Sequence, residues 1–254
     1  MKKFVFIAML AAFLSSCGNG NDGKILKFGT CADYPPFEYY KDGVLDGFEI
    51  DLVKIIARNM GKEVVFEDMA FSTLLASLDN DFINVVFAGY GSSAEKREKY
   101  DFSLPYYPER MVFVYKKSNP ITDETQLAGK KIAYQLGSTA AKKWIEETIA
   151  DVELVPLDKM DLAIESLKAG HVEYVVIDEF VANVYCEKNF DLGYFVPDSL
   201  KLSDGIAMAV KKGSPLTAQI NKILKDLESS GELQKLREKW GLKQKWRLPD
   251  GSNL

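Results

Sequence analysis

Short apolar runs alternate with helical patterns along most of the chain, and this alternation constrains the fold more than any other feature. The predicted strands are ILKFGT (25–30), EVVFED (63–68), INVVFAG (83–89), KKIAYQ (130–135), VELVPL (152–157) and VEYVVID (172–178). Their β-branched, nearly continuous apolar character is typical of strands that are covered on both faces. The predicted class is α/β with largely parallel sheets.

Amphipathic segments fill the gaps between these strands. Residues 47–61 place Ile50, Val53 and Ile56 on one helical face, and Gly61 suits the position just after a helix end. Further helices are predicted at about 72–79, 93–100, 139–149, 159–169 and 179–188, followed by a C-terminal stretch around 220–227 and the short ELQKLREKWG.

A weak internal repeat divides the chain. Residues 74–89 align without a gap with 163–178, each copy being a helix, a tight turn and a buried strand. The alternative is chance, because any helix–strand unit has this pattern. A true repeat predicts two similar lobes, with Gly89 and Asp178 at equivalent strand ends. Ligands of open α/β sheets bind outside the carboxyl ends of the strands, so these two loops are candidates for a pocket.

Two other segments, 111–120 and 207–215, also resemble each other. Each has an apolar strand, paired lysines, a turn and a proline. We expect them to be the two crossings from lobe to lobe, and two crossings allow hinge bending.

The N-terminus has the features of an export signal. MKKFVFIAMLAAFLSSC combines a charged start, an apolar run too short to span a bilayer comfortably, and a cysteine. Leu14 to Cys17 resembles the bacterial lipobox. We expect 1–17 to be a lipoprotein signal peptide, Cys17 to be lipidated, 18–23 to be a flexible tether, and the protein to lie in the cell envelope on its lipid anchor. An N-terminal membrane helix is the alternative.

Composition excludes several classes of protein. Net charge is −5 with both signs mixed, and no basic block indicates a nucleic-acid partner. No metal, cofactor or catalytic motif is present. Cys31 and Cys186 are expected to be buried free thiols, although an oxidising compartment would permit one bridge.

The stretch FAGYGSSAEKREKY (87–100) joins a strand end to a helix start. Ser92 and Glu95 fit the S-x-x-E capping box, with Ser92 as the N-cap. The first N–H groups and the positive dipole end of a helix favour an anion. Gly89 and Gly91 allow a ligand to approach the backbone closely.

A cation and several aromatic rings accompany this stretch. Lys96 lies one turn into the predicted helix and can supply a positive charge, whereas Arg97 lies about 100° further round. Tyr90 lies between the two glycines and is predicted to be a ligand-binding residue as well. The alternative is a surface helix with solvated charges.

Rigid aromatic side chains near other strand ends are candidates for ligand stacking. Tyr34 and Phe37 flank two prolines that stiffen the loop after the first strand, and Phe71 precedes a helix. Loop packing is the alternative for all three.

Polar groups in the second half complete the candidate set. Ser138 and Thr139 lie at the start of a predicted helix. Their hydroxyl groups can cap this helix or bind the carboxylate of a ligand. Asp178 precedes another helix, so it is either an N-cap or the partner of an ammonium group.

The chain resembles the family 3 extracellular solute-binding proteins, the amino-acid receptors of bacterial ABC importers. The resemblance is carried by GTCADYPPFEYYKDGVLDGFEIDL, AFSTLLASL, FAGYGSSAEKREKYDFSLPYY, LAGKKIAYQLGST and ESLKAGHVEYVVIDE, and runs from about Lys24 to Gly241. It implies the periplasmic binding protein type II fold, two α/β lobes joined by two crossing strands. Lobe 1 would contain 24–109 and 204–254, and lobe 2 would contain 110–203.

The resemblance also implies roles for the candidates. It would place Tyr34 and Phe71 around the ligand side chain, Gly89 and Gly91 beside the ligand, Thr139 on the α-carboxylate and Asp178 on the α-ammonium group.

Three positions depart from the family pattern. Lys96 stands where many members have an arginine, and a lysine cannot reproduce its two parallel bonds to a carboxylate. Gly91 replaces a frequent serine or threonine. Cys31 stands where receptors for basic amino acids often carry an acid. These departures favour a polar or neutral amino acid, or a similar small zwitterion.

The expected function is therefore ligand capture by hinge closure and delivery to an ABC permease, by a monomeric protein that is not an enzyme. A periplasmic cyclohexadienyl-type dehydratase with the same fold is the alternative. Such an enzyme needs a general acid near the leaving hydroxyl group. Glu38 and Glu179 are candidates for it, but neither has a supporting constellation.

Overall fold

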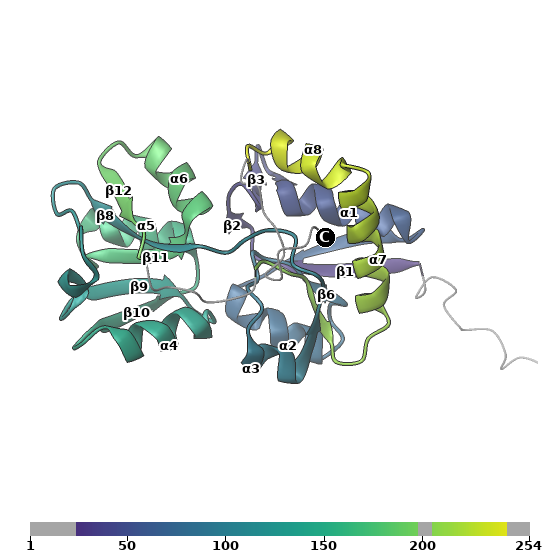
Figure 1. Cartoon of the computed structure of the whole chain (residues 1–254), viewed down its shortest axis with the longest axis horizontal. Helices are drawn as coiled ribbons and strands as arrows, with labels where there is room; N and C mark the ends of the chain where they lie inside the picture. Colours follow the sequence, from purple (N-terminus) through teal and green to yellow (C-terminus); the bar gives the residue numbers. More distant parts are fainter. Residues whose placement is uncertain (1–23, 198–204, 243–254) are drawn as a thin grey trace, which may run out of the picture.

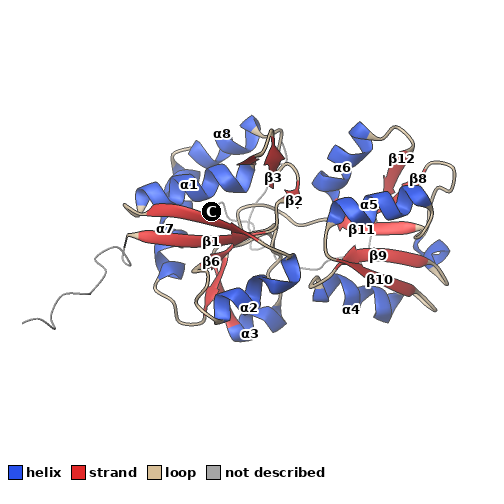
Figure 2. Ribbon diagram, turned by 180° about the vertical axis from the view of Figure 1, so that it is seen from behind, coloured by secondary structure: helices blue, strands red, loops and turns tan. Residues whose placement is uncertain are grey.

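A computed structural model describes residues 24–197 and 205–242, which form two lobes side by side (Figures 1 and 2). Each lobe contains one five-stranded sheet with helices on its faces. The predicted signal peptide, the tether and Cys17 lie outside the described residues. Of the helices in residues 24–197 and 205–242, none has the length and apolar character that a membrane crossing needs.

Lobe 1 is built from both ends of the described chain. Its large sheet contains β1 (Ile25–Thr30), β5 (Glu63–Asp68), β6 (Val85–Val86), β7 (Tyr100–Phe102) and β13 (Ala209–Lys211). Its helices are α1 (Phe48–Asn59), η1 (Phe71–Thr73), α2 (Leu74–Asp79), α3 (Ala94–Lys99), α7 (Leu216–Ser229) and α8 (Glu232–Lys239). A small sheet of β2 (Asp33–Tyr34), β3 (Glu38–Lys41) and β4 (Val44–Asp46) adjoins it.

Lobe 2 is built from the middle of the chain. Its sheet contains β8 (Met111–Lys116), β9 (Lys131–Gln135), β10 (Glu153–Leu157), β11 (Tyr174–Asp178) and β12 (Leu192–Phe195). Its helices are η2 (Glu124–Leu127), α4 (Thr139–Thr148), α5 (Met160–Ala169) and α6 (Glu179–Lys188).

The two large sheets share one order of strands, as the internal repeat predicts. Lobe 1 has the order β5-β1-β6-β13-β7, and lobe 2 has β10-β9-β11-β8-β12. In each sheet the first three strands are parallel and the other two pair antiparallel. Gly89 consequently follows β6 while Asp178 ends β11, and these two strands are equivalent.

Amphipathicity explains how α1 packs. The side chains of Ile50, Val53 and Ile56 are fully buried against the sheet of lobe 1, and each such burial contributes about 1.5–3 kcal/mol. The helix ends before Gly61, whose φ of 65° is left-handed and whose N–H donates to the carbonyl of Arg58. This is the ending that the sequence predicts.

The two lysine-bearing strands are not themselves the crossings between lobes, so this prediction was wrong. β8 pairs with β11 and β12 inside lobe 2, and β13 pairs with β6 and β7 inside lobe 1. Apolar strands of this kind are stabilised by neighbours on both edges. The chain passes from lobe 1 to lobe 2 through 103–110, before β8, and pairs with lobe 1 again at Ile206, which bridges to Gly91 and Tyr107.

Candidate ligand-binding site

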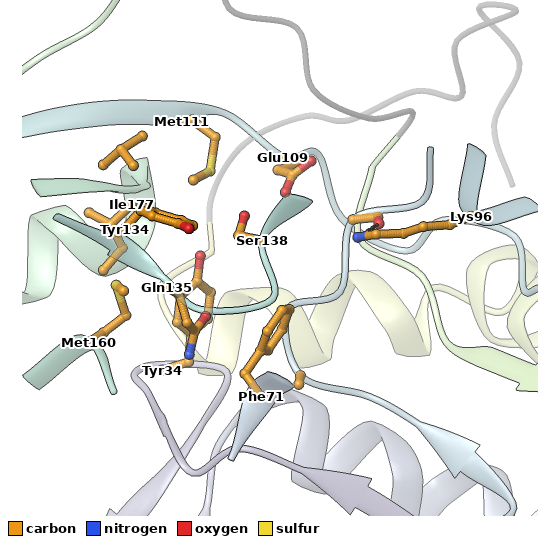
Figure 3. A pocket seen from close by; sticks show the side chains of 14 residues that line it. Tyr34, Phe71, Lys96, Glu109, Met111, Tyr134, Gln135, Ser138, Met160 and Ile177 are labelled. Atoms are coloured by element: carbon orange, nitrogen blue, oxygen red, sulfur yellow. Dashed lines mark hydrogen bonds between the residues drawn. The ribbon is translucent and has the colours of Figure 1, made fainter. Parts of the chain in front are cut away.

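A pocket lies between the lobes and is lined by both of them (Figure 3). The lining residues from lobe 1 are Tyr34, Phe71, Ala88, Gly89, Gly91 and Lys96; those from lobe 2 are Met111, Tyr134, Gln135, Ser138, Met160, Val176 and Ile177; and Glu109 comes from a crossing segment. Six of the sequence-predicted residues are in this set. Phe37, Tyr90, Thr139 and Asp178 are not.

Lys96 is the single cation among the lining residues. Its Nζ donates to the carbonyl of Gly91 at 3.0 Å and lies 4.1 Å from the ring centroid of Tyr90. Burial lowers the pKa of Lys96 to about 8, and the negative field of Glu109 opposes this shift. The ammonium group is therefore still largely charged at pH 7 and can receive an anion.

Helix α3 begins one residue later than the sequence predicts. Its N-cap is Ser93, whose Oγ accepts the N–H of Lys96 at 3.4 Å. Ser92 has another role, because its Oγ accepts from the guanidinium of Arg97 at 2.8 Å. The same guanidinium lies 5.3 Å from the ring centroid of Phe102. Arg97 thus supports lobe 1, and Lys96 alone of the basic pair lines the pocket.

Two glycines allow close approaches at the pocket wall. Gly89 has a left-handed φ of 56°, and a Cβ there would lie 2.6 Å from the ring of Tyr34. A Cβ at Gly91 would lie 2.6 Å from both carboxylate oxygens of Glu109. Real Cβ atoms do not approach so closely, so a side chain at either position would displace its neighbour.

The aromatic candidates separate into pocket and core. Phe71 lines the pocket and stacks on Tyr90 with centroids 4.9 Å apart. Tyr90 therefore supports the pocket from behind, under both Phe71 and Lys96. Phe37 is fully buried in the core of lobe 1, where its ring meets Tyr107 edge-on at 5.4 Å. Phe37 therefore belongs to the core and does not line the pocket.

The polar candidates of lobe 2 have structural roles as well. Ser138 is the N-cap residue of α4 and lines the pocket without a side-chain cap bond. Thr139 is exposed, and its N–H donates to the carbonyl of Gly137. Asp178 is buried and accepts the N–H of Phe180 at 2.9 Å and that of Arg110 at 3.1 Å. Its carboxylate thus caps α6 and fixes the chain just before β8.

Burial controls the charge of Asp178. It raises the pKa of this carboxyl to about 7, although its two backbone N–H partners lower it. Phe71 and Ser72 of lobe 1 lie close to Gly137, because a Cβ at Gly137 would be 3.0 Å from the Cα of Ser72. The lobes therefore meet around the pocket, and Asp178 is shielded from water.

Residues 26–243 match the family model of the bacterial extracellular solute-binding proteins, family 3. The chain belongs to this family. The matched region includes residues of both lobes and all the lining residues of the pocket. As a family 3 protein it has the type II periplasmic binding protein fold and is a solute-binding protein of an amino-acid ABC transporter, not an enzyme.

Similar proteins bind several amino acids. The arginine-binding extracellular protein ArtP of Bacillus subtilis is 34% identical over 251 residues, which cover 94% of this chain and 98% of ArtP. The L-cystine-binding protein TcyJ of Escherichia coli K12 is 30% identical, covering 85% and 82%. The solved structure of an ancestral arginine-binding protein bound to arginine is 35% identical with a TM-score of 0.79, covering 85% and 97%.

Sequence reasoning missed several lining residues of this family 3 protein. Gln135 ends β9 and Met111 begins β8, so their place at strand ends was a usable signal. For Glu109 and Met160 the sequence contains no such signal, because each reaches the pocket only through the packing of the two lobes. Ala88 lies in the stretch from Ala88 to Lys96 that the sequence predicts as half of the pocket, and the missed residues are Glu109, Met111, Tyr134, Gln135, Met160, Val176 and Ile177.

The sequence argument about Cys31 overlooked a neighbouring acid. The sequence argument against a basic ligand rested on Cys31, but a carboxylate lies next to this thiol. Asp33 Oδ1 accepts the S–H of Cys31 at 3.3 Å. Burial raises the pKa of the Cys31 thiol above its usual range, and both Cys31 and Cys186 are free. This part of the site therefore retains an acid, displaced by two positions along the chain.

Proposed function

We propose that this protein captures a free L-α-amino acid between its lobes, with arginine as the first candidate, and delivers it to the permease of an ABC importer. The observation that carries the proposal is the pocket itself, which is lined by both lobes and contains one half-buried cation, Lys96. A ligand that contacts both lobes favours the closed form and couples binding to hinge closure.

The α-carboxylate of the ligand would bind Lys96. The Nζ of Lys96 already meets a carbonyl oxygen at Gly91, so an acceptor can be reached from its present position. A single ammonium group gives one point contact, and Ser138 on the opposite wall offers a second, neutral donor. The carboxylate would then be held from both lobes.

The ligand side chain would lie against Tyr34 and Phe71. Both rings line the pocket, and a guanidinium group stacks favourably on aromatic faces. The carboxylate of Glu109 also lines the pocket, and those of Asp33 and Asp178 are buried beside it. Glu109 can therefore meet the cationic end of a ligand side chain, and a charge-assisted hydrogen bond of this kind is stronger than a neutral one.

This proposal revises the ligand expected from the sequence. A neutral or polar amino acid was favoured because Cys31 replaces an acid, whereas Asp33 lies beside Cys31 and Glu109 lines the pocket. Arginine-binding relatives support the same revision.

Isothermal titration calorimetry with arginine, lysine, histidine, glutamine and cystine tests the proposal. We expect arginine to bind most tightly and glutamine to bind more weakly, because glutamine brings no cation to the acids. Preference for glutamine over arginine would contradict the cationic assignment, and no binding by any amino acid would contradict the function.

We also propose that the chain is a monomer held at the outer face of a membrane by a lipid on Cys17. The lipobox pattern and the extracellular character of the family support this location. Replacing Cys17 with serine is expected to move the protein from the membrane fraction to the soluble fraction. An unchanged distribution would contradict the anchor.

A further inference from the structure

One buried carboxylate of lobe 1 is hydrogen-bonded to a helix of lobe 2. Asp33, in β2, accepts the backbone N–H of Met160 on its Oδ2 at 2.8 Å, and both partners are buried. Met160 is the first residue of α5. Asp33 is not a lining residue of the pocket, so the bond crosses between the lobes beside the ligand space.

No side chain of lobe 2 that the structure describes accepts the N–H of Met160, the first residue of α5, although Asp161 accepts that of Leu162 in the same turn. The N-cap residue of α5 is Lys159, which makes no side-chain cap bond. The first N–H groups of a helix need acceptors, and a carboxylate there also stabilises the helix dipole. In the neighbouring α6 the acceptor is the carboxylate of its own Asp178. In α5 the N–H of Met160 is instead accepted by Asp33 across the cleft.

A second contact across the cleft extends this connection. The other oxygen of Asp33 accepts the S–H of Cys31, and the Nε2 of Gln135 in lobe 2 lies 3.9 Å from the same sulfur. Gln135 lines the pocket. Asp33 is thus held in place from its own lobe while it caps the helix of the other.

We infer that Asp33 is a positioning residue for ligand capture, which stabilises the closed form by capping α5 across the cleft and does not contact the ligand. The inference rests on the proposed function. Opening the hinge separates β2 from α5 and returns both groups to water. Because the bond depends on closure and not on the ligand, it strengthens the binding of every ligand by the same factor.

Substitutions at Asp33 test the inference against a matched control. Loss of a helix cap costs about 0.5–2 kcal/mol, so Asp33→Ala is expected to weaken binding by about 2- to 30-fold, equally for arginine and for weaker ligands. Asp33→Asn retains an acceptor oxygen and is expected to recover most of the affinity. The control is Asp161→Ala, because the Asp161 carboxylate lies in the same helical turn but accepts only from Leu162 of its own helix.

A readout without ligand separates this inference from the proposed function. Single-molecule FRET can follow the distance between dyes at exposed positions of the two lobes, Lys54→Cys and Glu147→Cys in a Cys186→Ser background. We expect Asp33→Ala, but not Asp161→Ala, to reduce the closed fraction by the factor by which it weakens binding. If no amino acid binds, this shift still supports the cross-lobe cap. An unchanged closed fraction, or a loss of affinity confined to one ligand, would overturn it.

Discussion

Equivalent positions in the two lobes carry different chemistry. Strand β6 of lobe 1, which Gly89 follows, has the same place in its sheet as β11 of lobe 2, which ends at Asp178. Gly89 has no side chain and lets the ring of Tyr34 approach the backbone, whereas Asp178 uses both carboxylate oxygens on backbone N–H groups. One topology therefore provides a close approach in lobe 1 and a buried carboxyl group in lobe 2.

The helices that follow these strands differ in the same way. In lobe 1, α3 is capped by its own Ser93 and directs Lys96 into the pocket. In lobe 2, α6 is capped by Asp178, and α5, the helix that precedes β11, is capped by Asp33 of the other lobe. Lobe 1 is thus complete as an anchor for an anion, while lobe 2 depends on closure for one of its helix caps.

Removing the cation of lobe 1 is the strongest test of this difference. We expect Lys96→Ala to weaken amino-acid binding by at least about 30-fold, because loss of a buried charged partner costs about 2–5 kcal/mol. The control is Lys99→Ala, an exposed lysine on the same helix, which is expected to leave the affinity unchanged. Calorimetry measures both. Equal affinities for the two variants would show that lobe 1 is not the anchor.

The buried acid of lobe 2 should make stability depend on pH. The folded protein keeps the Asp178 proton up to about pH 7, whereas the unfolded chain loses it near the usual carboxyl pKa. This contribution to the free energy of unfolding is therefore complete below about pH 4 and is lost as the pH rises through about 7, at up to about 1.4 kcal/mol per pH unit.

Urea unfolding at pH 5, 6 and 7 measures this slope. We expect Asp178→Asn to have a smaller slope than the unsubstituted protein, together with a lower stability at pH 5 because one acceptor is lost. Lobe 1 offers a comparison in Glu38, whose pKa burial and the nearby Glu49 raise well above its usual value. If stability depends on pH equally in Asp178→Asn and in the unsubstituted protein, Asp178 is not the source of this dependence.

Substituting the glycine of lobe 1 tests the close approach. Gly89→Ala is expected to lower the free energy of unfolding by about 2–4 kcal/mol, the sum of a left-handed backbone penalty of about 1 and the clash with Tyr34. Gly61→Ala controls for the backbone penalty, since Gly61 also has a positive φ but open space around it. Chemical denaturation compares them, and equal losses would exclude the clash.

The smallest expected effect concerns the second residue of the basic pair. Arg97→Ala is expected to change the affinity less than about threefold while lowering the free energy of unfolding by about 1 kcal/mol, through loss of its bond to Ser92. Calorimetry and denaturation of the same sample measure the two quantities. A large loss of affinity with unchanged stability would mean that Arg97, and not Lys96, reaches the ligand.

Local patterns were sufficient to predict most elements of the fold. The strands at Ile25–Thr30 and Glu63–Asp68 and the helix at Glu179–Lys188 lie at their predicted bounds. The periodicity of a helix and the ends of a strand are set by residues close together in the sequence, so both can be predicted from it. The N-cap of α3 was missed by one residue because Ser92 and Ser93 are chemically alike, and only the contact with Arg97 distinguishes them.

Tertiary contacts explain the other differences. Phe37 looks like a pocket residue from its place beside Tyr34, but its ring belongs to a core that Tyr107 completes from 70 positions away (107 − 37). Glu109 and Met160 reach the pocket through lobe packing, which no local pattern records. The pocket residues that were predicted lie in the loops after strands or at the start of the next helix, where local patterns are informative.

A crystal structure of the protein with its tightest-binding amino acid tests the central claim most directly. We expect the α-carboxylate within hydrogen-bond distance of the Nζ of Lys96, the ligand side chain against Tyr34 and Phe71, and residues of both lobes in contact with the same molecule. An amino acid bound to one lobe alone, or a carboxylate directed away from Lys96, would contradict the account.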